Sequence, residues 1–346
     1  MALLLAQEFK ANGYLVHFVI RQGKDGGYTE EVVKHFQLTD LKAPRVRHFP
    51  AKLYQFYRHE EHPDIILTNL WPLTSTSVFV LRLAGVKSKI ACIEHGSLRY
   101  QVSKKSRWHH WILRNSLKWS MRFTDKMIGV SDGLKEELSE LSGYKGAKLI
   151  HIPNPIELPA PNQFLTGNIQ QTLTNLTDHT FLFVGRLKRV KNVPLLLEAF
   201  QKVLQKAKAE LIIAGDGAER AQLEGLANQL QISSHVHFLG FVDACTPLYQ
   251  HADTFVLSSD SEGFGNVLVE ALMMGCTVVS TDCPYGPQEI LDRGQFGYLS
   301  PVGDAEGLAE AMLQAMDAPI DSAKAKARGL SYAPPAIFKQ YQQALS

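Results

Sequence analysis

The sequence predicts an α/β protein with two tandem domains, each built on a parallel β-sheet. Short β-branched runs alternate with helical periods along the chain, and a polar stretch near the middle interrupts this alternation. The length of 346 residues suits two domains better than one core. A composition of 45% hydrophobic and 20% charged residues is typical of a globular protein and excludes a disordered or collagen-like chain.

Several other protein classes are disfavoured by the sequence. No apolar run approaches the roughly 18 residues of a membrane-spanning helix. The first residues lack the basic and small-residue segments of a secretory signal peptide, so we expect none. The four cysteines show no C-x-x-C spacing and are expected to be reduced core thiols in a cytoplasmic protein. They are Cys92, Cys245, Cys276 and Cys283.

The net charge of +2 argues against a dedicated nucleic-acid-binding protein. Residues 1–160 carry 23 Lys and Arg against 15 Asp and Glu, whereas the remaining residues carry 13 against 19. A basic first half and an acidic second half suggest two domains with different partners.

The first domain is expected to cover residues 1–155. Its first helix, residues 2–11, follows no strand, although a doubly wound domain normally begins with a strand and a glycine loop. We therefore expect the first strand of this domain to be missing. Later helices are expected at Tyr28–Phe36 and Ser131–Leu141, with Ser131 as N-cap. The expected strands are Tyr14–Ile20, Arg45–His48, Asp64–Thr68, Ser88–Ile93, Lys126–Val130 and Lys148–Ile152.

A stretch rich in Pro, Asn, Gln and Thr, residues 156–178, is expected to be the interdomain linker. The second domain, residues 179–346, restarts the alternation, and its last helix, about 334–346, is expected to pack back on the first domain. The expected strands are Phe181–Gly185, Glu210–Ala214, His235–Phe238, Thr254–Leu257 and Thr277–Ser280. The expected helices are Val193–Lys206, Ala218–Leu230, Asp243–Gln250 and Gly265–Met274.

The strongest chemical signal is the segment Ser261–Ala271, directly after an expected strand. Gly263 and Gly265 allow a sharp turn and a close approach of backbone to ligand. The following helix N-terminus suits a diphosphate, and Glu262 and Glu270 could each accept hydrogen bonds from vicinal hydroxyls. The alternative is a glycine-rich turn with two solvated glutamates.

A second cluster, Gly185–Asn192, follows the first strand of the second domain. Arg186 and Lys191 are well placed to neutralise a diphosphate leaving group. An ordinary basic loop is the alternative, and Lys188 and Arg189 fit that reading better.

The two clusters in this order resemble the retaining GT-B glycosyltransferases of family 4, which share a Gly-Arg-Leu…Lys-Asn segment and a Glu-x7-Glu pair. Supporting segments are Ala214–Gly217, His237–Val242 and Thr281–Pro287. The resemblance implies two Rossmann-like domains that face each other across a cleft. It also implies a nucleotide-sugar donor, with UDP the expected carrier and GDP open.

The resemblance assigns roles to individual residues. It implies that Glu270 binds the ribose, Glu262 the donor sugar, and Arg186 and Lys191 the diphosphate. Backbone N–H groups of Phe264, Gly265, Asn266 and Val267 would assist, and Phe241 and Val242 would border the nucleobase. His95, after an expected strand, matches the family's histidine that contacts the donor sugar, the alternative being a hydrogen-bonded core histidine. Asn154 and Ser131 are expected to be structural.

No metal is expected, because the histidines show no ligand spacing and GT-B enzymes use cationic side chains and a helix dipole instead. The implied mechanism is front-face displacement with retention, in which the departing phosphate helps to deprotonate the acceptor. Glu262 would then position the sugar and would not form a covalent bond.

The segment Arg99–Lys126 combines basic residues with Trp108, Trp111 and Trp119, which is a signal for a peripheral membrane helix. The alternative is a helix that packs on its own sheet with a solvated basic face. The membrane reading fits an enzyme that extends a lipid-linked glycan at the cytoplasmic leaflet.

The sequence thus predicts transfer of a hexose or N-acetylhexosamine from a nucleotide-sugar to a glycan or lipid-linked glycan, in surface polysaccharide or lipopolysaccharide synthesis. Two alternatives stay open at this point. One is an inactive GT-B partner subunit, and the other is a GT-B nucleotide-sugar epimerase, which needs no acceptor.

Overall fold

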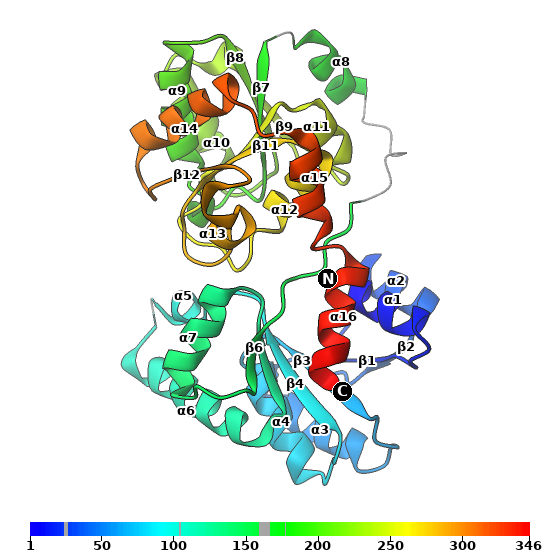
Figure 1. The fold of residues 1–346 in the computed structure, drawn as a ribbon. Coiled ribbons are helices and arrows are strands. Elements are labelled where there is room, and N and C mark those ends of the chain that lie inside the picture. The colour runs from blue at the N-terminus through cyan, green and yellow to red at the C-terminus, as the bar shows by residue number, and fades with distance from the viewer. Residues whose placement is uncertain (24–26, 104, 159–166, 177) are drawn as a thin grey trace. The chain divides into compact units, whose positions relative to one another are not determined.

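The computed structural model describes residues 1–23, 27–103, 105–158, 167–176 and 178–346 (Figure 1). It contains two compact units. Unit 1 comprises Met1–Pro155 and Pro334–Ser346, and unit 2 comprises Ile156–Ala333. The last helix, α16 (Pro334–Leu345), therefore belongs to unit 1, where it packs against α1 (Ala2–Ala11) through edge-to-face contact of Phe338 with Phe9.

Unit 1 contains two parallel sheets. One pairs β1 (His17–Ile20) with β2 (Gln37–Asp40), and the other has the order β3-β4-β5-β6. The strands of the larger sheet are β3 (Ile65–Asn69), β4 (Lys89–Glu94), β5 (Lys126–Gly129) and β6 (Leu149–His151).

The two sheets of unit 1 are separate among the described residues, since no described strand joins β1 to β3. Each sheet is parallel throughout, as expected for strands that are connected by helices.

Helices cover the larger sheet of unit 1. Helix α4 contacts α3 and α6, and α6 contacts α7, so these helices form a continuous layer. Ser131 caps α7 as expected, since its hydroxyl accepts from the N–H of Leu134. The helices of this unit are α1, α2 (Gly27–His35), α3 (Phe49–Tyr57), α4 (Leu73–Leu83), α5 (Leu98–Val102), α6 (Arg107–Phe123), α7 (Asp132–Ser142) and α16.

Unit 2 has one parallel six-stranded sheet with the order β12-β11-β10-β7-β8-β9. Every residue of β10 and β11 is buried, as expected where helices cover both faces of a parallel sheet. The strands are β7 (His179–Val184), β8 (Ala209–Ala214), β9 (Val236–Gly240), β10 (Thr254–Leu257), β11 (Thr277–Thr281) and β12 (Tyr298–Ser300).

The core of unit 2 forms between the sheet and helices α9 and α14, with Phe181, Phe183 and Phe200 fully buried. Burying such side chains stabilises the unit by about 2 kcal/mol each. The helices are α8 (Gly167–Asn175), α9 (Val193–Leu204), α10 (Arg220–Gln229), α11 (Thr246–His251), α12 (Asn266–Met274), α13 (Pro287–Ile290), α14 (Ala305–Asp317) and α15 (Ser322–Leu330).

One predicted strand is wrong. Residues 45–48 do not form a strand, since Val46–His48 is a turn of 3₁₀ helix that leads into α3. Pro50 occupies the first turn of α3, where its fixed φ favours a helix start, and this draws the preceding residues into a turn. The strand of this region is β2, which the sequence prediction missed.

Two further expectations need correction. The stretch expected to be a linker, residues 156–178, contains a helix, α8. Residues 159–166 and 177 of this stretch lie outside the described residues. The basic segment Arg99–Lys126 is not one helix, because α5 ends at Val102 before α6 begins at Arg107. The four cysteines are free thiols, and all but Cys245 are buried.

Candidate functional site

The sheet of unit 2 reverses its strand order between β7 and β10. From β7 the chain adds β8 and β9 on one side, and from β10 it adds β11 and β12 on the other. Open parallel sheets bind ligands outside the carboxyl ends of the strands at such a reversal. Both predicted motifs follow these two strands, since Gly185–Asn192 comes after β7 and Ser261–Ala271 comes after β10.

An ion pair joins the two motifs. Lys191 Nζ lies 2.6 Å from Glu262 Oε1, and the side chains are only 14% and 12% exposed. Glu262 Oε1 also accepts from the Ser259 hydroxyl at 2.6 Å. Limited access to water and two short, charge-assisted hydrogen bonds fix the carboxylate in one orientation. The site thus presents a cation and an oriented carboxylate at the switch point of the sheet.

Local backbone geometry holds these side chains in place. Asn192 adopts a left-handed conformation with φ of 45° and caps α9 by accepting from the N–H of Leu195. Its side-chain amide donates to Asp260 Oδ1 at 2.7 Å, and the N–H of Asp260 donates to the carbonyl of Val190 at 2.9 Å. The loops after β7 and β10 are therefore tied directly to each other.

Two glycines shape the loop before α12. Gly265, with φ of +97°, is the N-cap of this helix, which begins at the carboxyl edge of the sheet. Gly286, with φ of +115°, lies so close to the carbonyl of Phe264 that a Cβ there would overlap it. The Phe264 side chain is buried against the ring of Tyr332, so only its backbone could serve a ligand, whereas Asn266 is exposed and Val267 half-buried.

Glu270 lies deeper in the same helix. Its carboxylate accepts from the Tyr249 hydroxyl at 2.8 Å, and burial raises the pKa of Glu270 above its ordinary value. Tyr249 is itself buried on α11. Glu270 and Glu262 therefore differ in environment, one beside a phenol and the other beside an ammonium group.

The remaining predicted residues of unit 2 follow β7 and β9. Arg186 is exposed, and the next residue, Leu187, donates its N–H to the carbonyl of Asp216 at 2.9 Å. Phe241 is 75% exposed and Val242 half-buried directly after β9. An aromatic ring this exposed beside the carboxyl ends of the strands is available to a planar ligand group.

In unit 1, His95 follows β4 and contacts two amides. His95 Nε2 lies 3.0 Å from Asn69 Oδ1, and His95 Nδ1 lies 3.3 Å from Asn154 Oδ1. Burial lowers the pKa of His95 to about 4, so the ring is neutral at physiological pH and has one N–H to donate. Both ring nitrogens thus have partners within unit 1, which matches the alternative of a hydrogen-bonded core histidine. A sugar hydroxyl would have to replace one amide.

Glu94, directly before His95, is fully buried. Its carboxylate accepts from the backbone N–H of Trp71 at 2.9 Å and from the Thr74 hydroxyl at 2.7 Å. Burial raises the pKa of Glu94 to about 7. This carboxyl group holds the start of α4 against the end of β4.

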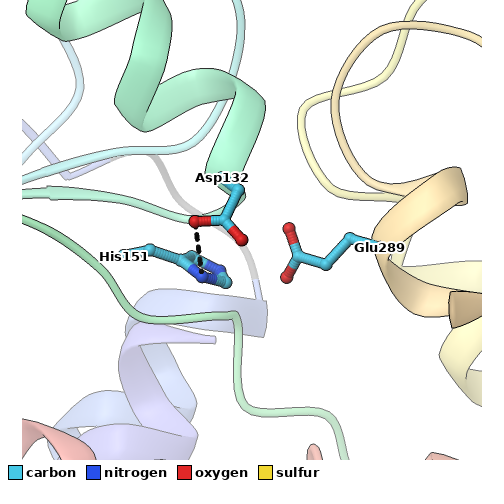
Figure 2. Close-up of side chains that lie close together, drawn as sticks. All are labelled: Asp132, His151 and Glu289. Atoms are coloured by element: carbon cyan, nitrogen blue, oxygen red, sulfur yellow. Dashed lines mark ion pairs between the residues drawn. The ribbon is translucent and has the colours of Figure 1, made fainter.

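A second pair of polar groups lies at the ends of β5 and β6. Figure 2 shows the ion pair between His151 Nδ1 and a carboxylate oxygen of Asp132, 3.5 Å apart. Glu289, drawn in the same figure, belongs to unit 2. Asp132 and His151 supply two ligand atoms, fewer than the three or four protein ligands of ordinary metal sites.

Sequence reasoning missed several partners of the predicted site residues. Ser259 follows β10 and Asn69 is the last residue of β3, at the same sheet edges as Glu262 and His95, so strand-end position was a usable signal for them. Tyr249 reaches Glu270 across 21 residues of sequence, and Thr74 reaches Glu94 across 20. Such pairings depend on how the helices pack, and no local pattern marks them.

Two family descriptions match this chain and together cover most of it. "Glycosyltransferase Family 4" matches residues 1–159, and "Glycosyl transferases group 1" matches residues 166–331. Among solved structures, HepE of Anabaena in complex with UDP superposes with a TM-score of 0.79 at 19% identity, over 99% of this chain and 94% of that one. This likeness establishes the fold of the chain as that of the GT-B proteins.

Several curated proteins share sequence with the chain. An uncharacterized glycosyltransferase of Methanocaldococcus jannaschii is 35% identical over 66% of this chain and 54% of its own length. A lipopolysaccharide core biosynthesis glycosyltransferase of Rhizobium meliloti is 31% identical over 56% and 54%. A Campylobacter jejuni N-acetylgalactosaminyltransferase, named for a diphospho-undecaprenol-linked acceptor, is 33% identical over 54% and 50%. The chain spans about half the length of these curated relatives.

Proposed function

The chain belongs to the family 4, group 1 glycosyltransferases, and on that premise we propose that it moves a hexose or N-acetylhexosamine from a UDP-sugar to a glycan acceptor. The observation that carries this proposal is the Lys191–Glu262 pair at the switch point of unit 2. It supplies a cation for a diphosphate and an oriented carboxylate for sugar hydroxyls in one place.

The donor nucleotide would occupy the edge of unit 2 formed by the loops after β7, β9 and β10. Lys191 and Arg186 would neutralise the diphosphate, together with the N-terminus of α12 at Gly265. Glu270 would accept from the ribose hydroxyls, and exposed Phe241 with Val242 would border the uracil. UDP is supported as the carrier because HepE of Anabaena, with the same fold, is described in complex with UDP.

We propose that transfer proceeds with retention at the front face of the sugar. The bond between the anomeric carbon and the diphosphate oxygen breaks, and the acceptor oxygen bonds to the same face of that carbon. The acceptor's proton passes to the departing phosphate oxygen, so no covalent enzyme intermediate forms. Glu262 orients the sugar, and the charges of Lys191 and Arg186 stabilise the leaving group without a metal ion.

In this proposal, His95 acts through an uncharged imidazole ring. Its uncharged ring would exchange the amide of Asn69 or Asn154 for a hydroxyl of the donor sugar. A neutral imidazole can position a hydroxyl but cannot add positive charge to the leaving group. Its contribution is therefore expected to be smaller than that of Lys191.

The proposed acceptor is a glycan or lipid-linked glycan of surface polysaccharide or lipopolysaccharide synthesis. The Rhizobium and Campylobacter relatives, which are named for such pathways, support this class of acceptor. None of the described helices is both long and apolar enough to cross a bilayer. We propose a peripheral location at the inner face of the plasma membrane, where lipid-linked acceptors would be reached.

The direct test is release of UDP from UDP-glucose, UDP-galactose and their N-acetylated counterparts, with and without a lipid-linked glycan fraction. Acceptor-stimulated release of UDP from one donor is the expected result, with Lys191→Met as the inactive reference. Release that does not depend on acceptor would instead fit an epimerase. The absence of release from every donor, with UDP binding intact, would contradict transferase activity and favour an inactive subunit.

A further inference from the structure

Helices α3 and α4 of unit 1 enclose an apolar groove of about 400 Å³. Its walls include Ala51 and Tyr54 from α3 and Phe79, Val80 and Leu83 from α4. Together with Thr76, the positions on α4 follow an i, i+3, i+4, i+7 pattern and so share one face of the helix. Phe79 is 58% exposed and Leu83 64%, an unusual exposure for two large apolar side chains on one face.

The groove is suited to a hydrocarbon chain and not to a polar ligand. Thr76, which also lines it, donates its hydroxyl to the carbonyl of Pro72 at 2.9 Å and so offers no free donor. The volume lies within the range of about 300–1,000 Å³ found for small-molecule sites. Arg58, the C-cap of α3, places a positive charge beside the groove, since its guanidinium lies over the ring of Tyr54, 5.6 Å from the centroid.

The outer face of α6 carries two parallel stripes. Trp108, Ile112, Trp119 and Phe123 are exposed and spaced by four, seven and four residues, which puts them on one side of the helix. A second exposed stripe runs beside it and consists of Arg107, Arg114, Lys118 and Arg122. Tryptophans next to cations are typical of surfaces that enter the headgroup region of an anionic bilayer.

The apolar stripe of α6 adjoins α4. Arg82, next to Leu83, donates from Nε to the carbonyl of Phe123 at 3.0 Å and pairs with Asp125 at 2.9 Å. Farther along, the indole N–H of Trp71 donates to the Ser116 hydroxyl at 3.0 Å. Helices α4 and α6 therefore lie side by side, and the groove is on the α3 side of α4.

We propose that the α3–α4 groove binds one acyl chain of an anionic phospholipid when α6 docks on the membrane. The inference rests on the proposed membrane location and adds to it the class of lipid that is bound and the groove that binds it. Charge complementarity selects the occupant, since Arg58 at the groove and the basic stripe of α6 match phosphate headgroups while the groove matches the acyl chain.

Photocrosslinking from vesicles tests this proposal on the full chain. A phospholipid with a diazirine in its acyl chain is added to phosphatidylcholine vesicles with and without phosphatidylglycerol, and labelled peptides are mapped by mass spectrometry. Label is expected on Phe49–Tyr57 and Leu73–Leu83, and only with phosphatidylglycerol present. Label confined to α6 would overturn the groove assignment, as would label that appears only when a polyisoprenyl phosphate carries the diazirine.

Ala51→Trp distinguishes the groove from the surface around it. The added indole fills the groove without removing apolar surface, so label on α3 and α4 should fall about tenfold while vesicle flotation is unchanged. Val33→Trp adds the same side chain at an exposed position of α2 and should leave the label unchanged. Equal labelling of both variants would overturn the proposal.

A second pair of variants tests the contribution of the rim to docking. Leu83→Ser should weaken flotation, whereas Leu330→Ser, at a leucine of similar exposure in unit 2, should not. UDP binding to the same preparations reports on the donor site independently. Absence of flotation by the parent chain, with intact UDP binding, would overturn the membrane surface and leave the donor site standing.

Discussion

The carboxyl ends of the strands carry different chemistry in the two units. In unit 2, the ends of β7 and β10 bring together a charged pair, Lys191 and Glu262, that keeps some contact with water. In unit 1, the ends of β3 and β4 bring together Asn69, His95 and Glu94. Burial favours the uncharged forms of His95 and Glu94.

The difference shows that the partners of a poorly exposed side chain, and not the parallel-sheet architecture, decide what a strand end can do. Glu262 keeps an ammonium partner at short range, whereas buried Glu94 accepts from a backbone N–H and a hydroxyl. An opposite charge favours the ionised carboxylate, and burial without one disfavours it. Unit 2 is therefore suited to a charged ligand, and unit 1 to neutral hydroxyls.

The largest expected effect comes from removing the cation of unit 2. Lys191→Met should lower kcat/KM for the UDP-sugar by about 10²–10³, because it deletes the charge that stabilises the leaving diphosphate. Steady-state release of UDP measures this.

Lys188→Met is the matched control for that variant. Lys188 is an exposed lysine in the same loop, and its loss should change kcat/KM by less than about twofold. A similar loss of activity in both variants would show that general basicity, and not the Lys191–Glu262 pair, serves the reaction. Melting temperatures of both variants exclude unfolding as the cause.

The stability of unit 1 should depend on pH through the two groups Glu94 and His95. The raised pKa of Glu94, about 7 against 4.5, makes unit 1 less stable as pH rises through that interval, because the unfolded chain releases its proton first. The lowered pKa of His95, about 4 against 6.5, has the opposite effect, since the unfolded chain holds the extra proton. Between pH 4.5 and 6.5 the two contributions oppose each other.

Glu94→Gln should expose the contribution of His95. The variant's stability should rise with pH from 4.5 to 6.5 by up to about 1.4 kcal/mol per pH unit relative to the parent chain. Calorimetric unfolding across this range measures the change, and Glu61→Gln, at an exposed position, serves as control. Parallel pH profiles for Glu94→Gln and the parent would refute the assigned burial effects.

A smaller effect is expected from the hydroxyl that orients Glu262. Ser259→Ala removes the donor at 2.6 Å and should lower activity about tenfold, with a stability cost of about 1 kcal/mol. Ser280→Ala removes a hydroxyl that is equally buried and donates to the carbonyl of Thr281. It should cost similar stability but no activity, so matching activity losses would speak against a positioning role for Ser259.

Much of unit 2 could be predicted because its strands are buried on both faces. Thr254–Leu257 has the predicted bounds, since its apolar run is continuous and flanked by polar residues. Strand β2 could not be predicted in this way, because Gln37–Asp40 is short, half-buried and contains one apolar residue, Leu38.

The charged residues of the candidate site could be predicted from the sequence, but the residues that they contact were harder to predict. Glu262 and Lys191 lie in loops directly after strands, where sequence motifs are visible. Their mutual contact spans 71 residues and follows from the adjacency of β7 and β10, which only the sheet order reveals. The burial of His95 between two amides likewise depends on β3 and β4 being neighbours.

In the proposed function, unit 2 holds a nucleotide site with Glu270 as a ligand group. Calorimetric titration of UDP into the parent chain and Glu270→Gln, with melting temperatures for both, tests it most directly. The variant should bind UDP at least about tenfold more weakly. It should melt no lower, because the amide can still accept from Tyr249 and no buried charge remains. Unchanged UDP affinity in Glu270→Gln, or no UDP binding by the parent chain, would contradict a nucleotide site at Glu270.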